Sequence, residues 1–140
     1  MTTYAEVASR TLTMIPDHLV AQAEIPNASE GGGRQGDVIV VPAPKLVPRG
    51  TGLTIAAAGV KVVPGDPDRN SHILSGDGLF YGGHYVDEVL DYGLLVVPAG
   101  GEAVLTHTGE HGSIAFGEGV YRVFGQLDYQ SHNVVDLVRD

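Results

Sequence analysis

The fold of this chain is decided by the stretch LTHTGEHGSIAFGEGVYRVFGQLDY, residues 105–129. Its Val-, Ile- and Phe-containing runs are short, and turns rich in glycine separate them. β-Branched and aromatic residues are typical of strands, and glycine supplies the backbone angles that tight hairpin turns need. The stretch therefore predicts successive short β-strands joined by hairpins.

The same pattern continues towards both ends of the chain. Glycine accounts for 20 of the 140 residues, about twice its usual share of roughly 7%. Such spacing predicts one all-β domain, a small jelly-roll-like sandwich or barrel of about 7–8 short strands. The tail, residues 133–140, fits either a last strand or a short helix. The other strands are expected at residues 37–41, 53–56, 60–63, 79–81, 94–97, 103–106, 113–116 and 120–124.

Residues 1–33 differ from the rest of the chain and are interpreted as an N-terminal arm, followed by a β domain over 34–140. Asp17 is placed to cap a short helical turn that Pro26 would end. Three consecutive glycines at 31–33 predict a flexible joint. We expect the arm to contact a partner through its apolar and aromatic residues, which are Tyr4, Leu12, Met14, Ile15 and Leu19.

Composition excludes several classes of function. Eight Lys and Arg residues stand against 17 Asp and Glu, which gives a net charge of −9. That charge repels nucleic-acid phosphates and anionic lipid, so neither nucleic acid nor membrane is expected as a partner. The absence of cysteine removes disulfides and thiolate chemistry. No basic, apolar leader opens the sequence, so we expect the protein to be made in a cytoplasm, either a bacterium's own or a phage host's, with the virion as a further location.

The candidate for chemistry is the histidine turn. His107 and His111 flank Glu110, and His72 could supply a further imidazole. If residues 108–112 form a hairpin loop, the two imidazoles approach each other and could bind Zn²⁺, Fe²⁺ or Mn²⁺. A helical zinc site is disfavoured because glycines occupy the turn. The alternative is that these histidines only hydrogen-bond the backbone of the turn, with no cofactor.

Several of these pieces resemble a group of short uncharacterised bacterial and phage-encoded proteins. The matching elements are Arg34-Gln35-Gly36-Asp37, His72, His111-Gly112, Gly119-x-Tyr121-x-Val123, Gln126-Leu-Asp128-Tyr129 and Val138-Arg-Asp140. The group carries a Gly-His-x-His element, in which Ser71 and Leu74 stand here for the glycine and the second histidine. The resemblance covers about residues 34–140 and implies a β fold and a bacterial or phage origin.

Two functions follow as hypotheses. The first is a non-enzymatic structural or assembly protein, such as a phage virion accessory protein that decorates or stabilises a capsid and binds neighbouring subunits, as a homo-oligomer or within a larger assembly. The second is a metal-binding β-barrel protein or metalloenzyme that uses the histidines. A ligand-binding barrel lined by tyrosines is a third alternative.

Overall fold

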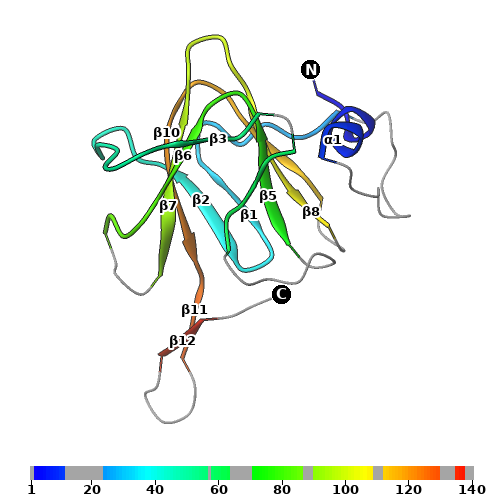
Figure 1. The fold of residues 1–140 in the computed structure, drawn as a ribbon. Coiled ribbons are helices and arrows are strands. Elements are labelled where there is room, and N and C mark those ends of the chain that lie inside the picture. The colour runs from blue at the N-terminus through cyan, green and yellow to red at the C-terminus, as the bar shows by residue number, and fades with distance from the viewer. Residues whose placement is uncertain are drawn as a thin grey trace.

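The computed structural model describes residues 2–11, 24–56, 58–63, 71–86, 90–108, 112–129 and 135–137. These residues form a β-sandwich with one short helix at its side (Figure 1), which confirms the all-β expectation. The elements are α1 (Tyr4–Thr11), β1 (Gly33–Gln35), β2 (Val38–Pro42), β3 (Leu53–Thr54), β4 (Val60–Lys61), β5 (His72–Gly76), β6 (Leu79–Gly82), β7 (Asp91–Val97), β8 (Ala103–His107), β9 (Ile114–Phe116), β10 (Gly119–Gly125), β11 (Leu127–Tyr129) and β12 (Val135–Leu137).

Two antiparallel sheets make the sandwich. The six-stranded sheet has the order β1-β2-β10-β7-β6-β3, and the four-stranded sheet has the order β4-β5-β8-β9. The expected hairpin of residues 103–116 is present as the β8–β9 pair, in which Leu105 lies opposite Ile114. β11 and β12 form a separate two-stranded hairpin that continues from β10 and projects beyond the sandwich (Figure 1). Residues 135–137 of the tail therefore form a strand, where the sequence left strand and helix open.

The core fills the space between the two sheets. Alternate residues of each strand point inward, as the period of two requires. Val123 of β10 lies between Val40 of β2 and Gly93 of β7, and the Phe116 and Tyr121 rings pack with their centroids 5.1 Å apart. The buried cluster consists of Val38, Val40, Ile55, Val62, Val63, Leu74, Phe80, Leu95, Val97, Ala103, Leu105, Phe116, Tyr121 and Val123.

The turn between β5 and β6 shows how glycine permits the sandwich to close. Gly78 has φ +131°, a conformation that L side chains rarely adopt, and a Cβ there would lie 2.3 Å from the Val96 carbonyl oxygen. No side chain fits this close approach, so position 78 requires glycine. The Asp77-Gly78 turn brings the chain from the four-stranded sheet of β5 to the six-stranded sheet of β6. Gly78 O also accepts a hydrogen bond from Ile55 N at 3.2 Å.

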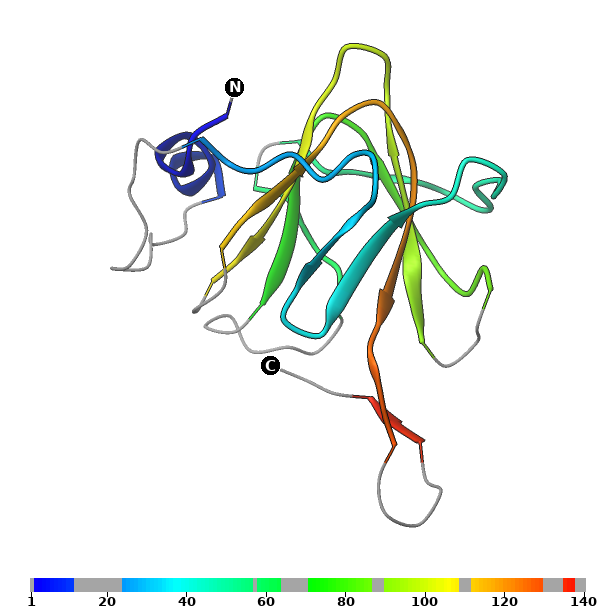
Figure 2. The ribbon, with the colours of Figure 1, turned by 180° about the vertical axis from the view of Figure 1, so that it is seen from behind.

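The described parts of the N-terminal arm pack on the chain's own β domain. Helix α1 lies beside the four-stranded sheet in both views (Figures 1 and 2). Val7 and Ile25 are each 1% exposed and pack with Val104 of β8 and Ala115 of β9. Residues 26–28 hydrogen-bond to β9 through Ala115, whose N–H donates to Pro26 O and whose carbonyl accepts from Ala28 N, both at 2.8 Å. Arg10 Nη2 also donates to Ser75 Oγ at 3.1 Å.

This packing alters the expected division of the chain. The boundary after residue 33 falls inside β1, which begins at Gly33 and pairs with β2. The expected flexible joint is a folded connection there, because Gly32 N donates to Ala28 O at 2.9 Å. The helical turn predicted over residues 18–24 lies outside the described part of the chain except for Glu24, which forms an isolated β-bridge with Thr3. No helix within the described ranges has the length and apolarity needed to cross a bilayer.

Candidate functional site

Two of the predicted site histidines meet in the interior of the sandwich. His72 begins β5 and His107 ends β8, and the two residues are direct cross-strand partners. Their ring centroids are 4.6 Å apart and their planes are inclined by 60°. His72 is 1% exposed and His107 is 2% exposed. Antiparallel pairing thus joins two imidazoles that lie far apart in the sequence, as the proposal of His72 as a further imidazole requires.

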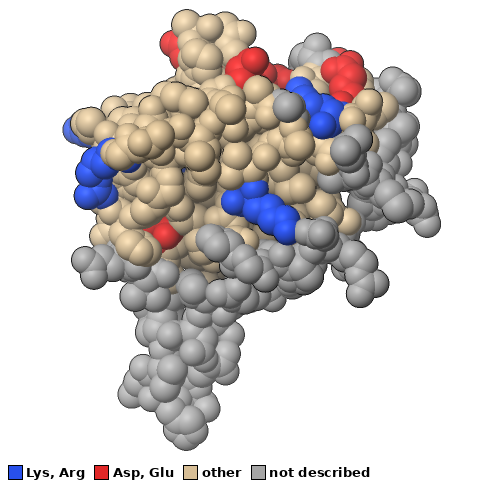
Figure 3. All heavy atoms as spheres, viewed as in Figure 1, with Lys and Arg blue, Asp and Glu red and all other residues tan. Residues whose placement is uncertain are grey.

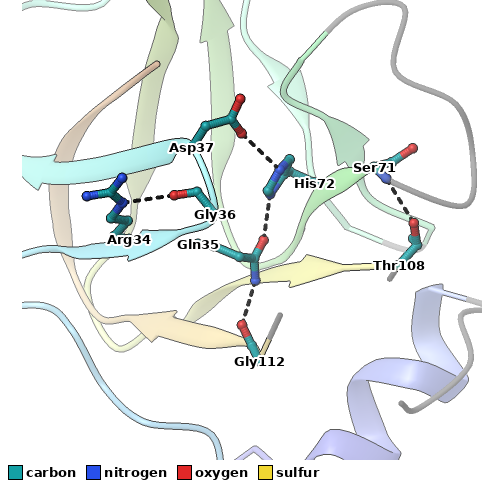
Figure 4. A network of polar contacts seen from close by, with 8 residues as sticks. All are labelled: Arg34, Gln35, Gly36, Asp37, Ser71, His72, Thr108 and Gly112. Atoms are coloured by element: carbon teal, nitrogen blue, oxygen red, sulfur yellow. Dashed lines mark hydrogen bonds and ion pairs between the residues drawn. The ribbon is translucent and has the colours of Figure 1, made fainter. Parts of the chain in front are cut away.

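Gln35 holds His72 from the opposite sheet (Figure 4). Its side-chain nitrogen Nε2 donates to Leu105 O at 3.0 Å and to Gly112 O at 2.8 Å. These two bonds fix the amide orientation, so Oε1 faces His72 Nδ1 at 2.9 Å. Because an amide oxygen only accepts, His72 Nδ1 must carry the proton of this bond. A single glutamine therefore connects β1, β5, β8 and the segment before β9.

Asp37 completes the cluster from the turn between β1 and β2. Its Oδ1 lies 3.6 Å from His72 Nε2, and its side chain is 5% exposed. Gly36, at φ +58°, forms the tight turn that places Gln35 and Asp37 on either side of it. The Asp37 carbonyl accepts from Gln126 N at 2.9 Å, and Arg34 Nε donates to Gly36 O at 2.9 Å. The Arg34-Gln35-Gly36-Asp37 motif is thus a turn that inserts two polar groups into the sandwich.

Next to the cluster, two hydrogen bonds join the residue before β5 to the residue after β8. Thr108 N donates to Ser71 O at 3.0 Å, and Ser71 N donates to Thr108 Oγ1 at 2.9 Å. Buried polar groups that are hydrogen-bonded in this way fix one arrangement of the strands, since any other arrangement would leave them unsatisfied. The cluster can therefore act as a polar lock between the two sheets.

The remaining predicted site residues lie elsewhere or outside the described ranges. Glu110 and His111 fall within residues 109–111, and Leu12, Met14, Ile15 and Leu19 fall within 12–23, neither of which the structure describes. Tyr4 is half-buried against the cluster of Val7, Ile25, Val104 and Ala115. Within the described residues no group of three or more His, Asp or Glu side chains is arranged to hold a metal ion.

Reasoning from the residues did not identify Gln35 and Asp37 as site residues. The signal that could have found them is the Arg-Gln-Gly-Asp motif itself, which the resemblance singled out. A glutamine and an aspartate that flank a glycine, directly before a continuous apolar strand, predict a turn with two polar groups next to the core. Their contact with His72 depends on how the two sheets pack, which the motif alone does not give.

A second feature is the outer face of the six-stranded sheet, which points away from the core. Residues of β10, β7 and β6 form a continuous apolar row there, in which Val120 lies opposite Val96 and Val96 opposite Leu79. A solvated face of an antiparallel sheet is normally polar. Here the outward positions are mostly apolar and, apart from the buried Leu94, half-buried or exposed. They are Ile39, Val41, Leu79, Tyr81, Leu94, Val96, Val120 and Phe124.

The charges on this face are nearly balanced. Arg122 Nε donates to Asp91 Oδ1, and the Arg122 guanidinium carbon lies 4.0 Å from the centre of the Phe124 ring. Asp91 Oδ2 accepts in addition from Tyr85 N at 2.7 Å. Arg34, on β1 at the sheet edge, adds one exposed cation. Among the described residues of this face, the acidic side chain is Asp91, and it is paired with Arg122. The chain as a whole has a net charge of −9.

Comparison with known proteins gives a family and no relative of known activity. The model of a family described as a domain of unknown function (DUF8820) matches residues 34–126, well over half of the chain. This range begins at the Arg34 turn and contains Gln35, Asp37, His72 and His107. No curated protein and no solved structure matches the chain.

Proposed function

Since the chain belongs to the DUF8820 family, whose description names no activity, we propose its role from its own surface: a non-enzymatic assembly protein that associates with further copies of itself. The observation that carries this proposal is the apolar outer face of the six-stranded sheet. Strands that are apolar at consecutive positions, such as Val38–Val41 and Leu94–Val97, are typical of sheets covered on both faces. Among the described residues, one face of this sheet packs against the other sheet, and the residues of its outer face other than Leu94 are half-buried or exposed.

A second copy of the chain is the occupant that fits this face. Two copies related by a twofold axis would bring the same patch together, so each patch must be complementary to itself. An apolar row with one internally paired acid meets that condition, because no two unpaired carboxylates would be brought together. The acid-rich remainder of the surface would stay in solvent, where its charge keeps the assembly soluble.

The proposed contact surface is the outer face of the six-stranded sheet, in place of the arm expected from the sequence. The expected arm residue Tyr4 is used in packing α1 against the chain's own sheet, so it has less surface to offer a partner. The resemblance to phage-encoded proteins extends the proposal to a virion accessory role, such as decorating or stabilising a capsid. A repeated, self-complementary β domain suits such a role.

Light scattering coupled to gel filtration tests the association. We expect the full chain to elute with a mass above the 14.6 kDa of one copy, and Val96→Lys to reduce it to one copy. Lysine at position 96 would place a charge in the centre of the apolar row, where its desolvation opposes association. A melting curve for each variant shows that Val96→Lys is folded.

The matched control is Ala99→Lys, which adds the same charge at an exposed position beyond β7. This variant should keep the wild-type mass. A wild-type chain that stays at one copy up to high micromolar concentration would contradict the proposal, and so would a Val96→Lys chain that associates like the wild type.

A second candidate function, transition-metal binding, is favoured by the histidine pair. Metal-binding histidines usually donate their other ring nitrogen to a fixed acceptor, which orients the ring. Gln35 supplies such an acceptor to His72 Nδ1, and the Nε2 on the opposite side of the ring lies towards Asp37. In this reading His72 and His107 would be the ligands, and Zn²⁺, Fe²⁺ or Mn²⁺ the ions that suit them.

Elemental analysis of the purified full chain tests the metal hypothesis. If it is correct, we expect close to one equivalent of a transition metal per chain, and loss of that metal in His72→Gln and in His107→Gln. His84→Gln, at an exposed position, is the control and should retain the metal. A transition-metal content far below one equivalent per chain, unchanged after dialysis against Zn²⁺, would contradict metal binding. The cluster would then have a structural role only.

A further inference from the structure

We propose that the hollow between residues 45–49 and residues 84–86 binds an acidic, extended peptide segment of another protein. This site is separate from the histidine cluster and involves chain segments that the proposed self-association does not use. The hollow is formed by two chain segments joined through Arg49 and Tyr85, and it is lined by exposed apolar side chains and by two cations.

Arg49 and Tyr85 build the hollow by joining two distant segments. The Arg49 side chain donates from Nη2 to His84 O, and its guanidinium carbon lies 4.5 Å from the centre of the Tyr85 ring. Tyr85 Oη accepts from Arg49 N at 3.1 Å. The second segment is in turn held by Asp91, whose carboxylate accepts from Tyr85 N and Val86 N. The walls are therefore fixed before any ligand arrives, which lowers the entropic cost of binding.

The hollow is large enough for several side chains. One part has a volume of about 380 Å³ and is lined by Lys45, Leu46, Val47, Arg49, His84, Tyr85 and Val86. A second part of about 440 Å³ shares Arg49, His84 and Tyr85 and extends along Gly50, Gly82 and Gly83. Because the two parts share three residues, they adjoin and form one depression.

Exposed apolar side chains gather at this depression. Val47 is 72% exposed and Val86 is 65% exposed, and among the described residues they are the two most exposed large hydrophobic side chains. Both line the same part of the hollow. Single exposed apolar residues are ordinary, whereas two that line one hollow offer a ligand apolar contacts on both sides of it.

The described lining of the depression carries two cations. Lys45 and Arg49 line it, and no described Asp or Glu side chain does. The positive atoms at the left edge of Figure 3 lie where Figure 1 draws the segment that follows β2. Exposed residues alternate along this segment as cation, valine and cation at positions 45, 47 and 49. Their complement is a segment that places carboxylates on both sides of an apolar side chain.

A nucleic acid or an anionic membrane fits this surface less well. Both present many negative charges, which two cations cannot neutralise and which the net charge of −9 repels. A short peptide with two or three carboxylates avoids most of that repulsion, and it uses the apolar walls as well.

Fluorescence anisotropy with a labelled peptide Gly-Ser-Glu-Leu-Glu-Leu-Glu-Ser-Gly tests the proposal on the full chain. We expect saturable binding that weakens as salt is added, because surface charges are screened. Lys45→Glu should weaken binding about tenfold or more, since it turns an attraction into a repulsion. Lys61→Glu changes the net charge equally but lies on β4, away from the hollow, and should bind like the wild type. A peptide with Gln in place of Glu should bind at least about tenfold more weakly.

Three outcomes would overturn the proposal. These are absence of saturable binding, equal binding of the Gln peptide, and equal loss in Lys45→Glu and Lys61→Glu. Inorganic phosphate, a single-stranded oligonucleotide and vesicles containing anionic lipid are added as competitors. If one of them displaces the labelled peptide more strongly than unlabelled peptide does, that competitor and not a peptide is the ligand of the hollow. Val96→Lys separates this proposal from self-association, because it should abolish assembly and retain the peptide.

Discussion

Replacing Gln35 with leucine should lower the free energy of unfolding by about 4 kcal/mol, because two buried groups and one part-buried group each lose a hydrogen bond worth roughly 1–3 kcal/mol when unsatisfied. The three groups are the carbonyls of Leu105 and Gly112 and the Nδ1 of His72. Leucine has a similar size, so the loss reports on the polar contacts more than on a cavity. Chemical denaturation followed by circular dichroism measures it.

The neighbouring residue provides the control for this prediction. Arg34 is exposed on the same strand, and Arg34→Ala should change stability by no more than about 0.5 kcal/mol. A Gln35→Leu chain within about 1 kcal/mol of the wild type would show that the cluster is not a lock between the sheets. A double-mutant cycle with His72→Phe should give a coupling energy of about 0.5–3 kcal/mol, as expected for residues in direct contact.

Asp91→Ala should cost about 3–5 kcal/mol, the range observed when one partner of a buried ion pair is removed. The Asp91 side chain is fully buried and pairs with Arg122, which is itself 16% exposed. Its loss leaves the guanidinium without this carboxylate and removes the acceptor of the Tyr85 and Val86 N–H groups. Thermal and chemical unfolding of the purified chain measure the effect.

Asp91→Asn separates charge from hydrogen bonding in this prediction. Asparagine retains an acceptor for the two backbone N–H groups, so its cost should be clearly smaller than that of Asp91→Ala. The Asp91→Ala chain should also lose binding of the acidic peptide, since the turn at residues 84–86 loses its support. Equal stability of the alanine variant and the wild type would contradict the role assigned to this carboxylate.

The sequence pattern is sufficient to predict most of the strands. Strands are predicted within Val38–Pro42, Asp91–Val97 and Gly119–Gly125, because these segments are rich in aliphatic and aromatic residues and are bounded by turn residues. β1 was not predicted, because Gly33-Arg-Gln35 contains no apolar residue. β5 was missed since His72 and Ser75 interrupt its apolar run. Both strands form because neighbouring strands satisfy their backbone, a contribution that no local pattern shows.

The histidine turn was predicted in part. The sequence predicts His107 and His111 as the pair, with His72 as a further imidazole. The β5–β8 register instead places His72 opposite His107, and His111 lies outside the described residues. The predicted arm was a poorer guide. A glycine run indicates freedom of the backbone, yet Gly32 and Gly33 are held by β2 and by the packing of Ala28 and Ile114 against Gly33. Those contacts are long-range and leave no trace in the local sequence.

The sequence by itself determined the fold class, the absence of thiol chemistry, and the presence of polar residues at two turns. These depend on composition, on strand periodicity and on turn residues, which act over a few positions. Only the tertiary structure decided that Gln35 joins two sheets, that the outer face of one sheet is apolar and largely half-buried, and that Arg49 meets Tyr85. Each of these is a contact between segments far apart in the chain, and its position depends on how the two sheets pack, which no short segment specifies.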